Sequence, residues 1–266
     1  MKENSALHTP HSALLTIDVG NSQTVCGVFE AEKLAGEWRY PTDKNIRVDT
    51  CEAELKQRLL SAGIKAEQVT GCVISCVVPS LSDSFKEVCL RLFGIEPLFV
   101  NIGLKMDISV KYEKPEELGA DRIANAVAVH HFYPGDTIIV DLGTATTFCV
   151  VSGKGDYLGG AIAPGVGVSL KALVNRAALL PSVDLCPPGK VIGGTTVESM
   201  RSGFVYGFAD MIDGIVKRMR KEFSSGAQVI ATGGWADLIG QFSQVITITD
   251  ISLTLKGLRI IYEMNS

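Results

Sequence analysis

The sequence predicts a two-lobed α/β protein, and three observations lead to that fold class. The length of 266 residues approaches two domains of ~150 residues each. A motif at Ile17–Val28 recurs at Val140–Val151 with one constant offset. Short apolar runs rich in β-formers alternate with segments of helical periodicity, which is the rhythm of an α/β sheet. We therefore expect two homologous lobes that are both mixed α/β.

The repeat preserves its key positions. The same offset takes Asp18 to Asp141 and Thr24 to Thr147, and it also aligns the Asp-x-Gly glycines. Each copy consists of an apolar run, then Asp-x-Gly with small polar residues, then a second β-rich run. This pattern predicts a β-hairpin with the aspartate at its bend.

The remaining elements follow in chain order. We expect strands at 69–78 and 227–232, helices at 80–93, 119–133 and 196–223, and loops at 159–167 and 180–190. The helix over 119–133 ends before Pro134-Gly135 and closes the first lobe. The predicted division is an N-terminal extension at 1–13, a first lobe at 14–134 and a second lobe at 135–266.

The longest predicted helix begins at a capping box, Thr195 to Glu198. One apolar stripe along it, a core or partner face, contains Phe204, Phe208, Met211, Ile212, Ile215 and Met219. Three glycines interrupt it, namely Gly203, Gly207 and Gly214. Glycine costs ~1 kcal/mol inside a helix, so a close approach of another backbone is a better explanation, and self-association is one possible cause.

Composition excludes several classes of function. The net charge is −4 and no basic stretch stands out, so we expect no nucleic-acid partner. The longest uncharged stretch, 157–170, is too short to span a bilayer, and the start does not resemble a secretory signal. Seven cysteines without a C-x-x-C pair are expected to be reduced core thiols. These features predict a cytoplasmic protein without a membrane partner.

The two Asp-x-Gly bends are the candidate chemistry. Glycine lets backbone N–H groups turn toward a phosphate, hydroxyls donate to its oxygens, and the aspartate can approach a hydrated Mg²⁺. A single bend would be explained as an ordinary turn, but two at a fixed offset favour a nucleotide held in an interdomain cleft. A Walker motif and a Rossmann fingerprint are both missing from the sequence.

Six motifs in this order resemble one family, the type III pantothenate kinases, also described as Bvg accessory factor-like. They are Asp18-Val-Gly-Asn-Ser22, Ser75-Cys-Val-Val-Pro79, Gly119-Ala-Asp-Arg122, Asp141-Leu-Gly-Thr-Ala145, Gly159-Gly-Ala-Ile-Ala-Pro-Gly165 and Gly193-Gly-Thr-Thr196. The similarity runs from about Leu14 to the C-terminus, and Gly-Ala-Asp-Arg is the most specific motif.

The resemblance implies the ribonuclease H-like fold shared by actin, sugar kinases and heat-shock ATPases, with ATP in the interdomain cleft. It also implies phosphorylation of pantothenate to 4′-phosphopantothenate, the first step of coenzyme A biosynthesis. The implied cofactors are ATP, Mg²⁺ and a monovalent cation, K⁺ or NH₄⁺. The implied partner is a second copy of the chain, in a homodimer that completes the substrate site.

The resemblance also assigns the nucleotide site. The phosphate-1 loop with its Mg²⁺ would comprise Asp18, Val19, Gly20, Asn21, Ser22, Gln23, Thr24 and Val25. Ser22 stands where the family more often has threonine, which keeps the hydroxyl. In the second bend Thr144 would contact ATP and Asp141 would bind the monovalent cation. Gly233 and Gly234 resemble the adenosine motif, although a strand-to-helix turn explains them locally.

The acceptor site carried over from the family centres on Gly119, Ala120, Asp121 and Arg122. Asp121 would be the base that accepts the proton of the pantothenate hydroxyl, and Arg122 would pair with the pantothenate carboxylate. Tyr112 and Thr196 match family positions that contact pantothenate. The alternatives are structural: a helix-start carboxylate for Asp121 and a solvated surface side chain for Arg122.

Three rival functions remain at this point. The first is a nucleotide-binding accessory factor for transcription that lacks kinase activity, against which intact Asp18, Asp121, Arg122 and Asp141 argue. The second is a sugar kinase or phosphatase of the same superfamily. The third is a structural dimer built on the glycine-bearing helix.

Overall fold

The computed structural model describes residues 12–266, whose contacts form two compact units. Unit 1 comprises the described part of Met1–Asp107 together with Glu113–Ala128 and Thr254–Ser266. Unit 2 comprises Ile108–Tyr112 and Val129–Leu253. The expected boundary at 134/135 differs from this division. The change from unit 1 to unit 2 falls between Ala128 and Val129, inside a helix, and the C-terminal helix belongs to unit 1. Most of the expected extension at 1–13 lies outside the described residues.

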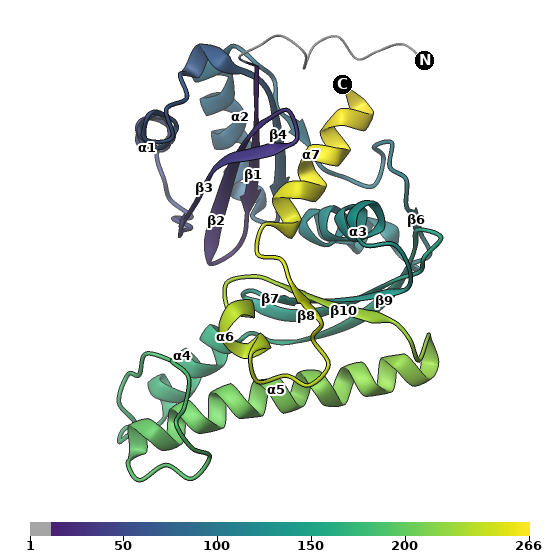
Figure 1. Cartoon of the computed structure of the whole chain (residues 1–266). Helices are drawn as coiled ribbons and strands as arrows, with labels where there is room; N and C mark the ends of the chain where they lie inside the picture. The colour runs from purple at the N-terminus through teal and green to yellow at the C-terminus, as the bar shows by residue number, and fades with distance from the viewer. Residues whose placement is uncertain (1–11) are drawn as a thin grey trace. The chain divides into compact units, whose positions relative to one another are not determined.

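Unit 1 is built on a five-stranded mixed sheet in the order β3-β2-β1-β4-β5 (Figure 1). Its strands are β1 Ala13–Val19, β2 Gln23–Glu30, β3 Lys33–Pro41, β4 Val69–Cys76 and β5 Leu98–Phe99. The first three strands run antiparallel as successive hairpins, and β4 joins β1 in parallel. The ends of β1 and β4 therefore meet at the same edge of this sheet.

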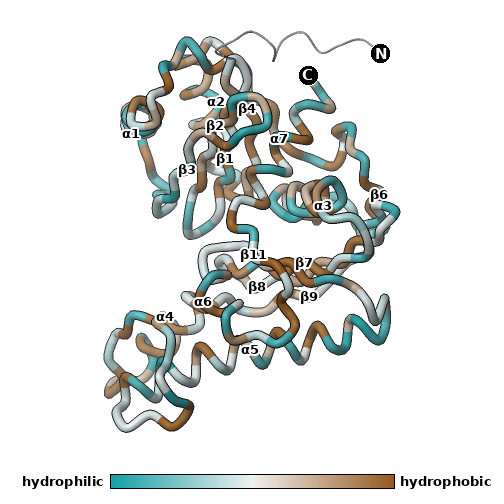
Figure 2. Tube along the Cα trace, viewed as in Figure 1, coloured by the Kyte–Doolittle hydropathy of each residue, from teal (hydrophilic) through white to brown (hydrophobic). Residues whose placement is uncertain are grey.

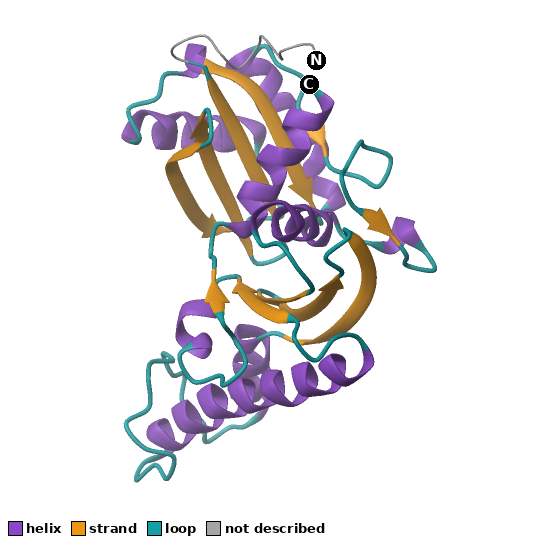
Figure 3. Cartoon of the chain, turned by 45° about the vertical axis from the view of Figure 1, so that its right-hand side comes forward, coloured by secondary structure: helices purple, strands orange, loops and turns teal. Residues whose placement is uncertain are grey.

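Helices cover both faces of the unit 1 sheet (Figure 3). On one face lie α1, Val48–Ser61, and α2, Pro79–Phe93, which bury Leu55 and Phe85 against the strands. Helix α2 starts with proline, which suits a first helical turn, and ends at Gly94, which adopts the left-handed conformation. The other face contacts α7, Leu253–Asn265, which packs on α3, Ala120–Phe132. A short 3-10 helix, η1 Ala66–Gln68, precedes β4.

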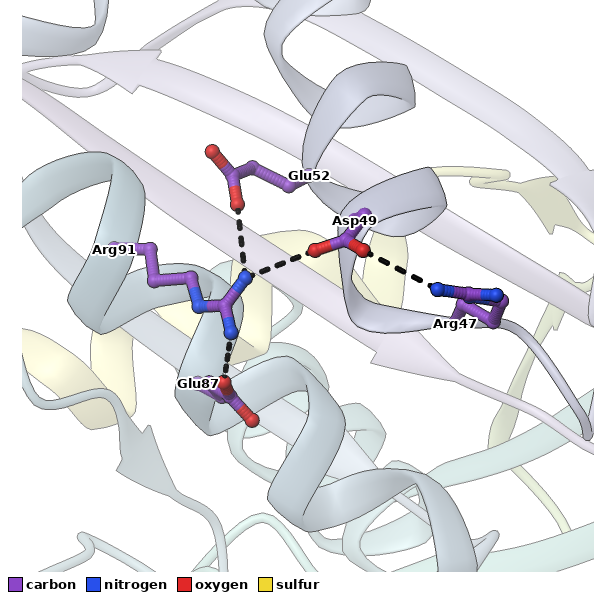
Figure 4. Close-up of polar contacts among 5 residues, drawn as sticks. All are labelled: Arg47, Asp49, Glu52, Glu87 and Arg91. Carbon is purple, nitrogen blue, oxygen red and sulfur yellow. Dashed lines mark hydrogen bonds and ion pairs between the residues drawn. The ribbon is translucent and has the colours of Figure 1, made fainter.

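An exposed ion network joins α1 to α2 (Figure 4). Arg91 on α2 is 3.0 Å from Asp49 and 3.7 Å from Glu52, both on α1, and it also pairs with Glu87 one turn back on its own helix. Arg47 extends the network at 3.6 Å from Asp49. Because these side chains are exposed, salt screens the pairs, and burial of Leu55 and Phe85 dominates the packing.

Unit 2 contains a six-stranded sheet in the order β11-β10-β7-β8-β9-β6. Its strands are β6 Ser109–Val110, β7 Thr137–Leu142, β8 Ala145–Val151, β9 Asp156–Pro164, β10 Gln228–Thr232 and β11 Ile248–Thr249. The hairpin β7–β8 corresponds to β1–β2, so the predicted repeat of strand, bend and strand is confirmed in both units. The 3-10 helix η2, Pro115–Glu117, lies shortly before α3.

Helices α4, Val166–Arg176, α5, Thr196–Glu222, and α6, Ala236–Gly240, complete unit 2. Thr195 caps α5 by accepting a hydrogen bond from the Glu198 N–H at 3.2 Å, while the Glu198 carboxylate accepts from Gly194 N–H. The side of α5 that enters the core carries Val205, Ala209, Ile212 and Val216. Figure 2 shows apolar positions recurring along α5 between hydrophilic ones.

One prediction about unit 2 is corrected. Residues 159–167 are not a loop, because 159–164 belong to β9 and α4 begins at Val166. Glycine favours loops in general, but here Gly160 faces the carbonyl of Phe148 on the neighbouring strand, where a Cβ would lie only 1.6 Å from that oxygen. The predicted stripe of α5 agrees with a core or partner face: Ile212 is buried in the core, while Phe204 and Phe208 pack against the core and also line a surface cavity.

All seven cysteines are free, and five of them are buried as expected for core thiols, whereas Cys76 and Cys186 are half-buried. Burial raises the pKa of Cys26 and Cys51 to about 12, so both thiols stay protonated at neutral pH. Among residues 12–266, no helix combines the length and apolar character needed to cross a bilayer.

Candidate active site

The first bend closes the β1–β2 hairpin at one edge of the unit 1 sheet. Asp18 faces Val25 across the ladder, and Gly20 N–H donates to Gln23 O at 3.0 Å to form the turn. Asp18 is half-buried, whereas Asn21, Ser22 and Gln23 are exposed. The bend therefore presents backbone and small polar groups to solvent beside a partly enclosed carboxylate.

Thr42, which directly follows β3, supports this bend and was not identified from the sequence. Its hydroxyl donates to Gly20 O at 2.7 Å and lies 2.9 Å from the Thr24 hydroxyl, while its N–H donates to Ser22 O at 3.0 Å. These contacts join residues about twenty positions apart, so no local signal in the sequence indicates them. Thr42 fixes the shape of the bend through both backbone and side chain.

Two cations also lie at the first bend. The Lys44 ammonium donates to Asn21 Oδ1 at 3.0 Å, and the Arg39 guanidinium donates to Gln23 Oε1 at 3.3 Å. Both contacts are exposed, so the side chains are able to exchange partners. Arg39 also lies 4.0 Å from Glu37, so Lys44 is the cation that contacts the bend without an ion pair of its own among residues 12–266. A cation beside an exposed bend favours a polyanionic ligand.

Gly119–Arg122 lies at the same edge of unit 1 as the first bend. Val77, which follows β4, donates its N–H to Val19 O at 3.1 Å, and its side chain lies close to Gly119. The tetrapeptide forms the start of α3, with Asp121 in the first turn. The structure thus brings the first bend and the tetrapeptide to one region of unit 1.

The Asp121 carboxylate folds back onto the helix start. Its Oδ1 accepts a hydrogen bond from Arg122 N–H at 2.8 Å. A Cβ at residue 119 would lie 2.5 Å from this oxygen, so glycine provides the space that the carboxylate occupies. Burial raises the pKa of Asp121, although the Arg122 N–H and guanidinium both act to lower it.

Arg122 is buried, with 8% of its surface exposed. Such low exposure excludes the alternative from the sequence analysis in which Arg122 is a solvated surface side chain. A buried guanidinium is retained where an anion or several acceptors face it, because an unpaired buried charge is costly.

The second bend closes the β7–β8 hairpin of unit 2. Gly143 N–H donates to Ala145 O at 3.1 Å, and Thr144 is exposed at the tip. Gly233 approaches this bend so closely that a Cβ there would lie 2.6 Å from Asp141 Oδ1, and its φ of +90° is itself a glycine conformation. Asp141 and the Gly233–Gly234 turn are therefore direct neighbours.

Tyr112 and Thr196 lie on different elements of unit 2. Tyr112 follows β6, and its ring meets Tyr157 edge to face, with centroids 6.2 Å apart, beside Gly159. Thr196 opens α5 and is exposed at the rim of a cavity of about 880 Å³. The cavity lies between α4, α5 and the segment before α5, and its lining includes Gly203, Phe204, Gly207 and Phe208.

Comparisons with known proteins identify the relatives of this chain. Residues 14–218 match the family described as type III pantothenate kinase. A protein named type III pantothenate kinase from Halalkalibacterium halodurans is 43% identical over 252 residues, covering 95% of this chain and 99% of that protein.

Solved structures with low sequence identity share the fold. One is described as a proposed Baf family transcriptional activator from Campylobacter jejuni, with a TM-score of 0.57 and 20% identity, covering 94% of this chain and 97% of that one. Another is an inorganic polyphosphate/ATP-glucomannokinase from Arthrobacter sp. strain KM, with a TM-score of 0.50 and 14% identity, covering 95% and 99%. The expected fold class of actin-like and sugar-kinase-like proteins is confirmed, and the chain belongs to the type III pantothenate kinase family.

Proposed function

We propose that this chain transfers the γ-phosphoryl group of ATP to the primary hydroxyl of pantothenate, giving 4′-phosphopantothenate and ADP. This is the first step of coenzyme A biosynthesis. The observation that carries the proposal is the family match, which covers most of the chain. The matched part contains an acidic group that is suited to the chemistry. That group is Asp121, whose pKa is raised by burial beside the buried Arg122.

Asp121 acts as the general base in this proposal. The hydroxyl oxygen of pantothenate forms a bond to the γ-phosphorus while the bond from that phosphorus to the β,γ-bridging oxygen breaks. The hydroxyl proton moves to the Asp121 carboxylate, and ADP leaves with the electron pair of the broken bond. A raised pKa makes the carboxylate a stronger proton acceptor, while Arg122 N–H keeps its Oδ1 oriented at 2.8 Å.

Pantothenate is held by its carboxylate and its polar chain. The guanidinium of Arg122 matches a carboxylate in a bidentate pair, which orients the substrate as well as attracting it. Tyr112 and Thr196 supply hydroxyls to the remaining polar groups. Both residues lie within the part of the chain that matches the family, which supports the assignment.

ATP is held by the two bends. Backbone N–H groups and hydroxyls of Asp18–Val25 receive the phosphates, with Thr144 contributing from the second bend and Gly233–Gly234 lying against the adenosine. Lys44 and Arg39 beside the first bend add positive charge where the triphosphate approaches.

The residues at the first bend also fit a bound Mg²⁺. Asp18 is aligned with Ser75 on the adjacent strand, so both side chains project from the same face of the sheet. Within residues 12–266 the buried Ser75 hydroxyl has no hydrogen-bond partner, which leaves an oxygen beside the carboxylate. Mg²⁺ prefers oxygen ligands, and when bound it neutralises developing charge on the phosphates.

Asp141 is the proposed ligand of a monovalent cation. Its Oδ1 lies close to Gly233, which leaves space beside the oxygen, and a carboxylate oxygen is a ligand that suits K⁺ or NH₄⁺. Turnover measured in Na⁺ buffer should rise when K⁺ is added. Equal rates in the two buffers would remove this role from Asp141.

A homodimer is the proposed assembly, with the cavity beside α5 as the contact between copies. If Gly203 or Gly207 carried a Cβ, no heavy atom of residues 12–266 outside the α5 backbone would lie within 4 Å of it. This leaves room for a partner backbone. The cavity lining is largely apolar, and Leu179 and Ile192 beside it are 95% and 85% exposed. Gly214 differs, because the Arg218 side chain of the same helix covers it. A partner would bury the apolar residues around Thr196.

We place the protein in the cytoplasm, where ATP is available and free thiols persist. The rival accessory factor without kinase activity is not favoured, because the chain belongs to a family of kinases.

A coupled assay of ADP release tests the proposed function. The wild-type chain should release ADP when pantothenate is added, and a panel of hexoses should give only the background rate. Release with a hexose and not with pantothenate would assign the chain to another kinase activity. Absence of release with every acceptor would favour the non-catalytic alternative.

A further inference from the structure

Gly165 lies between β9 and α4, directly against the tip of the second bend. Its N–H donates to Thr144 O at 3.1 Å, and its own carbonyl accepts the first helical hydrogen bond of α4 from Ser169 N–H at 3.0 Å. The residue thus belongs both to the helix start and to the contact with the bend. It is buried, unlike the exposed Thr144 that it holds.

The approach of Gly165 excludes any side chain. A Cβ there would lie 2.3 Å from Thr144 O, 2.4 Å from Gly143 O and 2.7 Å from the Thr144 carbonyl carbon. All three are backbone atoms, so no rotation of a side chain relieves the overlap. The φ of −77° and ψ of 161° suit any residue, and the close approach is therefore what requires glycine.

The neighbours of Gly165 are anchored, so an added methyl group would displace the bend instead. Pro164 is aligned with Ala145 in the β8–β9 ladder, and Val166 is fully buried in the core of unit 2. Gly143 and Thr144 form the tip of a tight turn and are less buried than Gly165 and Val166. The overlap would be relieved by a shift of that tip.

The contact also orients a peptide group. Because the Thr144 carbonyl points toward Gly165 and a trans peptide is planar, the N–H of Ala145 points away from the start of α4. A backbone N–H held in a fixed direction at an exposed bend is an efficient donor to a phosphate oxygen, since no reorganisation is needed on binding.

We infer that Gly165 is a positioning residue of the nucleotide site, which holds the Thr144–Ala145 peptide in the orientation that binds the terminal phosphates of ATP. It acts through the bend and does not itself contact the nucleotide. The inference rests on the proposed kinase activity and extends it to a residue outside both Asp-x-Gly motifs.

The test is Gly165→Ala with Gly189→Ala as the matched control. Gly189 is exposed in the same unit. Apart from its chain neighbours, no heavy atom of residues 12–266 would lie within 4 Å of a Cβ at this position. We expect Gly165→Ala to raise the KM for ATP by about 10- to 100-fold, the scale of a displacement of about 1 Å, with the KM for pantothenate within about twofold of wild type. Gly189→Ala should leave both constants unchanged.

An unchanged KM for ATP in folded Gly165→Ala would overturn the inference, and so would an equal rise in both KM values. Hydrogen exchange on the wild-type protein covers the case in which the variant does not fold. ATP with Mg²⁺ should slow exchange in peptides spanning 143–147 and 163–168. Protection of 18–25 alone would show nucleotide binding without the inferred role. If wild-type protein releases no ADP with pantothenate, the proposed function itself fails, which is a separate result.

Discussion

The Asp121 carboxylate illustrates how one short segment supplies both a reactive group and its support. The glycine two positions earlier provides space, and the next backbone N–H fixes one carboxylate oxygen at 2.8 Å. Enclosure by protein then raises the pKa of the group. The contacts that orient Asp121 come from neighbours in sequence, so the tetrapeptide motif carries most of the local geometry.

Replacing Asp121 with asparagine should separate catalysis from folding. Asp121→Asn keeps the shape and the acceptor oxygen but removes the proton acceptor, so kcat should fall by about 10²–10⁴. ATP binding, measured by calorimetry, should remain. Turnover near the wild-type rate with saturating pantothenate would make Asp121 a helix-start residue only, with Asp18 as the next candidate base.

The same variant should be more stable than wild type at pH 7. Because the pKa of Asp121 is raised in the folded state, that state binds the proton more tightly, and stability falls as pH rises through the window between the unfolded and folded pKa values. A neutral amide in place of the carboxylate would remove this cost of ionisation. Thermal unfolding should show a higher Tm for the variant at pH 7 and a smaller difference below the ordinary aspartate pKa of about 4. A lower Tm at pH 7 would contradict the burial argument.

Replacing Arg122 should change the KM for pantothenate and not mainly kcat. Loss of a charge-assisted bidentate contact costs about 1.5–3 kcal/mol, so Arg122→Ala should raise the KM for pantothenate roughly 10- to 100-fold. The KM for ATP should change less. Arg47→Ala, at an exposed position on the surface of unit 1, is the control and should leave both constants unchanged. A selective rise in the KM for ATP would move Arg122 to the nucleotide site.

At the scale of elements, α5 has two different faces. Val205 and Ala209 enter the core of unit 2, whereas Gly207 and Phe208 line the cavity. Apolar periodicity indicates that a helix is amphipathic, but it does not distinguish a core face from a face that contacts a partner. The sequence therefore predicted the helix and its cap correctly, and it left open whether the stripe with Phe204, Phe208 and Met211 is a core face or a partner face.

The cavity face can be tested by a bulky residue at Gly207. Gly207→Trp should weaken the dimer strongly, because the indole would fill space that the partner needs. Asp210→Trp, exposed on α5 outside the cavity lining, is the matched control and should leave association unchanged. Sedimentation at assay concentration measures both. A fully active wild-type monomer, or an undisturbed dimer in Gly207→Trp, would contradict the proposed interface.

At the scale of the whole molecule, the predictable part of the fold is the part with local signals. Both hairpins, helix α2 with its initial proline, and the capped start of α5 agree with the sequence. What escaped prediction depends on contacts between distant segments. Helix α7 belongs to unit 1 because Gly257 packs on the backbone of Ala124, and no signal near residue 257 indicates that partner.

The candidate site shows the same limit. The Asp-x-Gly repeat and Gly119–Arg122 are visible as motifs, and their catalytic roles remain predictions. Thr42 and Lys44 belong to no motif, and the motif that ends at Gly165 does not indicate its contact with the second bend, because each of these residues acts through a bend about twenty positions away in sequence. Residues that support a motif are found only when the chain is folded.

The most direct test of the central claim is identification of the reaction product. Wild-type protein incubated with ATP, Mg²⁺, K⁺ and pantothenate should yield 4′-phosphopantothenate by mass spectrometry, in an amount equal to the ADP formed. Asp121→Asn should yield far less product under the same conditions. Formation of ADP without phosphorylated pantothenate, or equal product from the variant, would contradict the proposed transfer of phosphate to pantothenate with Asp121 as the base.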